Sequence, residues 1–165
     1  MKEVFKPGFT YTIETLKDGQ IVDREVQHNL IPTEGLNHIL SVLLSGGAQV
    51  ATWYIGLYEG NYTPSTNDVM ATFPAAATET TAYGAATRIE FTEGAIAAGA
   101  VDNSAARAEF TFNATKTIYG GFICSSPAKG NASGTLLSVV RFGSPKPVES
   151  GSVLRVTAGF STLSS

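Results

Sequence analysis

The stretch FTYTIETLKDGQIVDREVQ, residues 9–27, contains the clearest structural signal in this chain. Apolar and polar residues alternate over residues 9–16, and the same alternation returns over residues 20–27. A period of two is typical of a β-strand with one buried face. Asp18-Gly19 lies between the two segments, and both residues tolerate the positive φ of a tight turn. The sequence therefore predicts an N-terminal β-hairpin.

A short amphipathic helix is expected to follow the hairpin. Thr33 can cap its first turn, and Gly46-Gly47 can supply the positive φ that ends a helix. Between them, apolar residues recur at three- and four-residue spacing, namely Leu36, Ile39, Leu40 and Leu43. We expect this apolar stripe to lie on the surrounding strands.

Strands account for most of the remaining chain. Residues 53–58 are bulky and apolar apart from Gly56, a composition typical of a strand that is buried on both faces. Further strands are expected at residues 87–91, 106–113, 116–125, 134–142 and 152–161, with turn-prone stretches at 126–131 and 143–147. About eight strands and one early helix predict a mainly β protein, with a two-sheet antiparallel sandwich or jelly roll.

Residues 62–86 interrupt this succession of strands. They are rich in Thr, Ala and Pro, and Pro64 and Pro74 prevent a long regular element, although residues 67–71 could make one helical turn. So long an irregular segment is typical of a functional loop or an arm. A well-packed cover over the sheet fits the same composition. Both interpretations stay open at this point.

The composition indicates one domain, residues 1–165, with a weakly charged surface. A chain of 165 residues suits a single core. Charged residues make up 15% of it, against about 25% in ordinary domains, and such a surface tolerates close packing of many copies. The net charge of −3 and the scattered Lys and Arg residues provide no basic stripe for phosphates. We therefore expect no nucleic-acid partner.

Signals for membrane insertion or secretion are also missing from the sequence. The longest apolar run, near residues 36–44, is too short and too interrupted to span a bilayer. The N-terminal residues contain no apolar leader segment. We expect no membrane partner, and a chain that stays in the cytoplasm unless a larger assembly carries it out.

Residues that could carry chemistry are few and dispersed. His28, His38 and Cys124 do not stand at the spacing of metal ligands, and the apolar neighbours of Cys124 indicate a core residue. The Gly-x-Ser-x-Gly elbow of serine hydrolases is absent. Gly120-Gly121 and Gly134 lack the Lys of a phosphate loop and indicate a bend or a close backbone approach. We predict no catalytic, cofactor-binding or metal-binding residue, and no enzyme.

Two carboxylate pairs and one aromatic run come nearest to a carbohydrate site. Glu90 with Glu93, and Glu59 with Asp68, are the closest pairs in sequence, and a glycosidase uses two carboxylates. Solvated strand and turn positions explain these pairs more simply. An aromatic sugar platform could be drawn from one run that otherwise has the composition of a core, namely Trp53, Tyr54 and Tyr58.

Several motifs in fixed order carry a resemblance that covers nearly the whole chain. They are Asn29-Leu30-Ile31, Gly35-Leu36-Asn37-His38-Ile39-Leu40, Trp53-Tyr54-Ile55-Gly56-Leu57, Arg88, Phe110, Tyr119-Gly120-Gly121-Phe122, Gly134-Thr135-Leu136-Leu137 and Val148-Glu149-Ser150-Gly151-Ser152-Val153-Leu154-Arg155-Val156-Thr157. In this order the chain resembles small virion proteins of tailed bacteriophages, those encoded beside the major capsid protein and described as head decoration, or cement, proteins. The motifs bear on the fold rather than on catalysis.

The resemblance implies a jelly-roll protomer that forms a homotrimer on the outside of an icosahedral capsid, at its threefold positions. Its partners would be the major capsid protein and further copies of itself. Such a protein clamps neighbouring capsid subunits, and weak individual contacts add up through multivalency. An arm that reaches the shell could come from residues 1–8 or from residues 62–86.

Two other functions stay open. The first is a tail or head-fibre component that binds a host-surface glycan through the aromatic run at residues 53–58. The second and weaker one is a hydrolase that uses Cys124 or the Glu90 and Glu93 pair.

Overall fold

The N-terminal hairpin forms as the sequence predicts. The computed structural model describes residues 8–162, which begin with β1 (Gly8–Lys17) and β2 (Gln20–His28) paired antiparallel. Asp18 and Gly19 form the turn, with φ of 50° and 75°. Residues 1–7 of the possible N-terminal arm lie outside the described residues, and Gly8 already belongs to β1.

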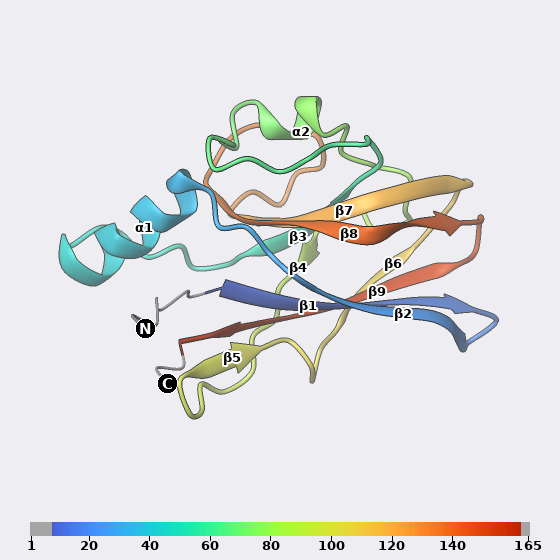
Figure 1. Ribbon diagram of the computed structural model, residues 1–165, viewed down its shortest axis with the longest axis horizontal. Helices are drawn as coiled ribbons and strands as arrows, with labels where there is room; N and C mark the ends of the chain where they lie inside the picture. The colour runs from blue at the N-terminus through green and yellow to red at the C-terminus, as the bar shows by residue number, and fades with distance from the viewer. Residues whose placement is uncertain (1–7, 163–165) are drawn as a thin grey trace, which may run out of the picture.

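Two antiparallel sheets pack face to face and form the predicted sandwich (Figure 1). The first sheet has the order β2-β1-β9-β5, and β6 pairs with β9 beside β5. The second has the order β4-β3-β7-β8. The remaining elements are α1 (Thr33–Leu44), β3 (Tyr54–Tyr58), α2 (Phe73–Ala76), β4 (Ile89–Glu90), β5 (Ala100–Asp102), β6 (Ala108–Thr111), β7 (Lys116–Cys124), β8 (Leu136–Val148) and β9 (Val153–Ser161).

The main core lies between the two sheets. In β9, Leu154, Val156 and Ala158 are buried and alternate with more exposed residues, as expected for a strand with one face toward the core. Tyr11 and Ile123 belong to the same cluster, from β1 and β7 respectively. Tyr11 also places its hydroxyl 2.8 Å from the Ser138 hydroxyl of β8. Apolar contact and this buried hydrogen bond therefore join the two sheets.

A second apolar cluster lies on the other face of the β4-β3-β7-β8 sheet. Residues 62–86 cross that face and include α2 (Figure 1). Phe73 is 1% exposed. Its ring packs edge-on against the rings of Tyr58 and Phe122, with ring centres 5.8 and 5.2 Å apart respectively. Met70 and Ala77 are fully buried in the same cluster. Of the two interpretations of residues 62–86, these contacts support the packed cover. Strand β3 is consequently buried on both faces, as predicted.

Two glycines let side chains and backbone approach closely within this sheet. A Cβ on Gly120 would lie 2.2 Å from both the Tyr58 hydroxyl and the Val140 carbonyl oxygen, and Tyr58 donates to that oxygen at 3.0 Å. A Cβ on Gly56 would lie 2.3 Å from the ring of Phe122. Gly120 thus confirms the close approach expected at Gly120-Gly121, and Gly134 has the positive φ of a bend, 96°.

Several predicted boundaries are wrong. The helical turn forms at Phe73–Ala76 instead of residues 67–71, because Pro74 suits the first turn of a helix and Phe73 is drawn into the cluster. The strand expected at residues 87–91 shortens to the two residues of β4, and β5 was not expected. The predicted turn at 143–147 is part of β8, whose edge position tolerates two prolines.

An ion-pair cluster of Lys146, Asp23 and Glu25, which we call the clasp, joins the end of β8 to β2. Lys146 is 3% exposed, and its ammonium lies 2.8 Å from the Asp23 carboxylate and 2.5 Å from that of Glu25. Glu25 also accepts a hydrogen bond from the backbone N–H of Gly143. The side chains of β2 therefore satisfy the cation and one backbone donor of the neighbouring sheet's edge.

The clasp predicts a pH-dependent loss of stability. Burial acts to raise the pKa of Glu25, but the hydrogen bonds from Lys146 and Gly143 outweigh it and hold the pKa below its usual value. The Glu25 contribution is then complete above the unfolded pKa of about 4.3 and is lost as pH falls through the folded pKa. We expect Glu25→Gln to lower the free energy of unfolding by about 1–2 kcal/mol at neutral pH. Urea titrations should show this difference shrinking below about pH 4, and a difference that is constant with pH would contradict the clasp.

Candidate interaction surfaces

Helix α1 is fastened to the sandwich by its first turn. The Glu34 carboxylate accepts hydrogen bonds from the backbone N–H groups of Met70, at 2.9 Å, and Leu136, at 2.7 Å. Gly35 is the buried residue of the helix, and a Cβ there would lie 2.5 Å from the carbonyl oxygen of Leu137. Thr33 makes no capping hydrogen bond, contrary to expectation. The helix is therefore positioned by Glu34 and by the absence of a side chain at Gly35.

The remainder of α1 leaves its apolar residues uncovered. The expectation that the stripe lies on the strands is wrong, because only Ile39 packs partly against the core. Val42 is half-buried, and the leucines become more exposed toward the end of the helix: Leu36 40%, Leu40 52%, Leu43 71% and Leu44 80%. The helix contacts β8 through its first turn and lies at one end of the sandwich (Figure 1).

An open groove of about 490 Å³ lies beside this helix. One wall is formed by Ile39, Val42 and Leu43 of α1, and the sandwich contributes Phe9 and Phe160 from β1 and β9. Trp53 and Ile96 also line it, and Ile96 is 81% exposed. We call Leu40, Leu43, Leu44, Ile96 and this groove the end patch.

The end patch carries almost no charge. From Gly35 through Tyr58 the chain contains no Asp, Glu, Lys or Arg. Glu93 is the charged residue among the described groove residues, and it is exposed. His38 packs edge-on against the ring of Trp53, with ring centres 5.4 Å apart. The patch therefore suits an apolar partner rather than a charged one.

A second exposed apolar surface belongs to β2. Among the described residues, this strand has backbone pairs with β1 only, although its Asp23 and Glu25 side chains contact β8. Ile21, Val22 and Val26 are 51%, 61% and 49% exposed, and we call these three residues the β2 surface. Figure 1 places the β1–β2 turn, which Ile21 and Val22 follow closely in sequence, at the opposite end of the sandwich from α1. The two apolar surfaces are thus separate.

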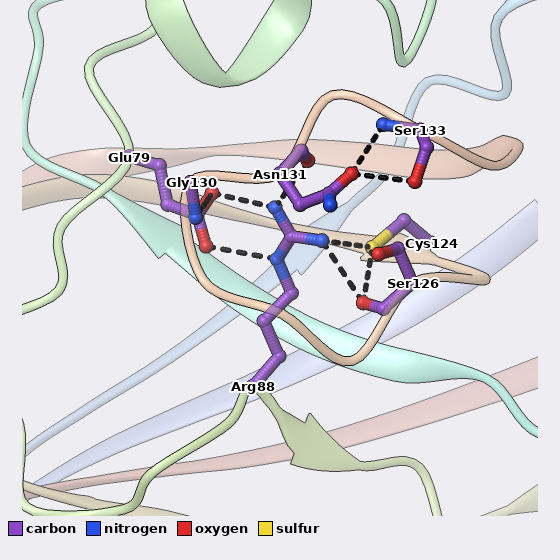
Figure 2. A network of polar contacts seen from close by, with 7 residues as sticks. All are labelled: Glu79, Arg88, Cys124, Ser126, Gly130, Asn131 and Ser133. Atoms are coloured by element: carbon purple, nitrogen blue, oxygen red, sulfur yellow. Dashed lines mark hydrogen bonds and ion pairs between the residues drawn. The ribbon is translucent and has the colours of Figure 1, made fainter.

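A buried ion pair connects the loops next to the β4-β3-β7-β8 sheet. Arg88, directly before β4, donates two hydrogen bonds to the Glu79 carboxylate, at 2.8 and 2.7 Å, and the two side chains are 0% and 2% exposed. Figure 2 shows the guanidinium between Glu79 on one side and Cys124 and Ser126 on the other. It also donates to the carbonyl oxygens of Ser126 and Asn131, both at 2.9 Å. One side chain therefore joins residues 62–86, which we call the cover segment, to the end of β7 and the loop before β8.

The cysteine belongs to the same network. The Cys124 thiol is buried, lies 3.4 Å from an Arg88 nitrogen and donates to the Ser126 carbonyl oxygen at 3.5 Å. Burial is the largest influence on this thiol and raises its pKa, which keeps it protonated near neutral pH. Its neighbours match the packing role that its sequence context indicates.

The histidines and the first carboxylate pair occupy separate places. His28 is exposed at the end of β2 near the hydroxyl of Thr10, whereas His38 lies in the groove. Glu90 is an exposed residue of β4, and Glu93 is exposed at the groove. Within residues 8–162, no group of three or more His, Cys, Asp or Glu side chains is placed to hold a metal ion. None of these residues is brought to a common centre with Cys124.

The second carboxylate pair and the aromatic run are engaged in packing. Glu59 pairs with Lys116 at 2.9 Å, while buried Asp68 accepts hydrogen bonds from the Tyr62 hydroxyl and the Ser65 backbone. Tyr58 is fully buried. Trp53 and Tyr54 keep partial exposure, so an aromatic sugar platform would consist of those two at most.

The sequence pointed to neither the end patch nor the Glu79–Arg88 pair as a feature of interest. The uncharged run from Gly35 to Tyr58 was the available signal for the patch. Arg88 appeared only as one residue of the family resemblance. The part of the chain that the structure describes contains no helix long and apolar enough to cross a bilayer. No protein-family model matches this sequence, and a search of curated protein sequences gives no significant match.

Proposed function

We propose that this chain is a virion structural protein that binds the outer surface of a tailed-phage capsid and stabilises it as a decoration, or cement, protein. In this proposal it acts as a homotrimer whose partner is the major capsid protein, and it is made in the host cytoplasm before joining the virion. The observation that carries the proposal is the presence of two separate exposed apolar surfaces, the end patch and the β2 surface, on one sandwich.

Two surfaces are what a cement requires. It has to contact further copies of itself and also the shell, so that several weak shell contacts act together. The body between those surfaces has to hold its shape when the shell pushes outward. The sandwich core, the Arg88 network and the packed cover at residues 62–86 supply that rigidity. The order of motifs that resembles decoration proteins supports the same assignment.

We assign the shell contact to the β2 surface. Its strand edge is free of backbone pairs among the described residues, and its side chains alternate exposed apolar groups with charges such as Arg24, whose side chain is 62% exposed. Such a mixture is typical of an interface formed between folded proteins. An open edge also allows backbone pairing with a strand of a capsid subunit.

Sedimentation with capsid shells tests this proposal. The purified chain is mixed with expanded, undecorated shells, and we expect it to sediment with them at a fixed stoichiometry. Val22→Lys should weaken this binding at least about tenfold per site, because a valine-sized apolar contact is replaced by a charge. Val69→Lys is the matched control, since Val69 is 36% exposed but lies in the cover segment, and it should bind like the parent chain. A parent chain that fails to sediment with the shells would refute the capsid function.

A tail or head-fibre component that binds a host-surface glycan is the second candidate. The observation in its favour is Trp53, an aromatic side chain in an open groove that also contains Gln49 and Glu93. A glycan array and an adsorption assay on whole host cells separate the two functions. Glycan-dependent adsorption that Trp53→Ala abolishes, together with no shell binding, would favour the fibre.

A further inference from the structure

We propose that the end patch is the surface through which neighbouring copies of this chain contact each other. This inference deepens the proposed function, because it assigns a place to the self-association that a homotrimer requires. The starting observation is that Leu43, Leu44 and Ile96 are 71%, 80% and 81% exposed at one end of the molecule, beside a groove of about 490 Å³. Clustered apolar exposure of this kind marks an interaction site.

Within residues 8–162, no segment covers the patch, because Leu43, Leu44 and Ile96 stay mostly exposed. The walls of the groove add further apolar side chains, Trp53 and Phe160 among them. Such a broad apolar area suits the surface of a second folded molecule.

The charge pattern favours a copy of this chain over a charged partner. The only carboxylate of α1, Glu34, is turned toward the backbone of Met70 and Leu136, so the outward side of the helix is uncharged. A patch without charges offers nothing to orient nucleic acid or an acidic or basic peptide. Two such patches can meet without burying an unpaired charge, which would cost several kcal/mol. Like surfaces are consequently compatible here.

The shape of the patch gives the contact its geometry. The leucines of α1 project, whereas Trp53, Phe9 and Phe160 lie in the adjoining hollow. A projecting Leu43 of one copy can enter the groove of the next, and the same contact repeats from copy to copy. Such a head-to-tail contact closes into a ring when its rotation suits a symmetry axis, and three copies would then meet at their α1 ends.

Light scattering on the purified chain, without any shell, tests the contact. We expect a particle of three times the 17.3 kDa chain mass, and Leu43→Lys should raise the dissociation constant for self-association at least about tenfold. Leu43 is mostly exposed in the single chain, so the variant should keep the circular dichroism spectrum of the parent. Val22→Lys is the matched control, because it places the same charge on an exposed apolar position of the β2 surface and should leave the mass unchanged.

Tryptophan fluorescence adds an independent readout, because Trp53 is the only tryptophan and lines the groove. We expect its emission to shift to shorter wavelength as the parent chain associates, and the shift to be absent in Leu43→Lys. A parent chain that is monomeric at all concentrations overturns the inference. A second result would also overturn it: Phe5→Ser abolishes association while Leu43→Lys leaves association intact. The contact would then depend on the N-terminal segment and not on the end patch.

The outcomes separate this inference from the capsid function. A chain that self-associates through Leu43 but does not sediment with shells would support the contact and refute the cement. A monomeric chain that still sediments with shells would refute the contact alone. A dimer that Leu43→Lys dissociates would support the contact and contradict the threefold closure.

Discussion

Replacement of Arg88 by Met is expected to lower the free energy of unfolding by about 3–5 kcal/mol, the range measured when one partner of a buried ion pair is removed. The methionine would keep the apolar contact with the Phe122 ring, over which the guanidinium lies at 5.3 Å. The Glu79 carboxylate, only 2% exposed, would lose its two hydrogen bonds from the guanidinium and remain buried. The carbonyl oxygens of Ser126 and Asn131 would also lose their donor. Urea unfolding followed by circular dichroism measures the loss.

An exposed ion pair serves as the control for Arg88. Lys17 and Glu149 lie 2.9 Å apart, but their side chains are 55% and 66% exposed. Lys17→Met should therefore lower the free energy of unfolding far less than Arg88→Met does, because solvent screens an exposed pair. The double replacement Arg88→Met with Glu79→Leu should recover part of the lost stability, because no charge is then left buried. Equal costs for Arg88→Met and Lys17→Met would show that the network does not hold the loops together.

Replacement of Phe73 by Ala is expected to cost about 3–5 kcal/mol, as for other fully buried aromatic residues. Phe73 contacts Tyr58 of β3, Phe122 of β7 and Tyr62 of the cover segment. Removing the ring leaves a cavity between the cover and the sheet. Amide hydrogen exchange should show faster exchange in residues 62–86 than elsewhere in the variant, in addition to the loss of global stability.

Val69→Ala is the matched control for Phe73→Ala. Val69 lies in the same segment but is 36% exposed, so its replacement should cost less than about 1 kcal/mol. If Phe73→Ala were no more destabilising than Val69→Ala, residues 62–86 would behave as a loosely attached arm, which was the other interpretation of their sequence.

The fold class follows from local patterns that survive in the structure. Alternation at residues 9–16 and 152–161 produced β1 and β9, and Asp18-Gly19 produced the turn between β1 and β2. The apolar run at residues 53–58 produced a strand buried on both faces. These elements were predictable from local patterns. A two-residue period indicates which residues share a face of the strand, and turn residues that tolerate positive φ indicate where the chain reverses.

Local patterns were less informative where a residue's neighbours come from far along the chain. The stripe of α1 has a regular helical period, yet a period states only which residues share a face and not what covers that face. Residues 143–147 look like a turn, but they belong to β8, where Lys146 and Pro147 pair with β7 and Lys146 binds the carboxylates of β2. The end patch could not be located from the sequence for the same reason.

The sequence by itself determined a mainly β chain with an early hairpin, one short helix and a weakly charged surface, because these properties depend on residue order within about ten positions. Only the tertiary structure decided that Arg88 meets Glu79, Ser126 and Asn131, that residues 62–86 cover a sheet, and that α1 leaves its leucines exposed. The physical reason is that burial and ion pairing depend on which distant segments meet in space. Residue order fixes the apolar faces, and the packing of the sandwich selects which of them remain open to a partner.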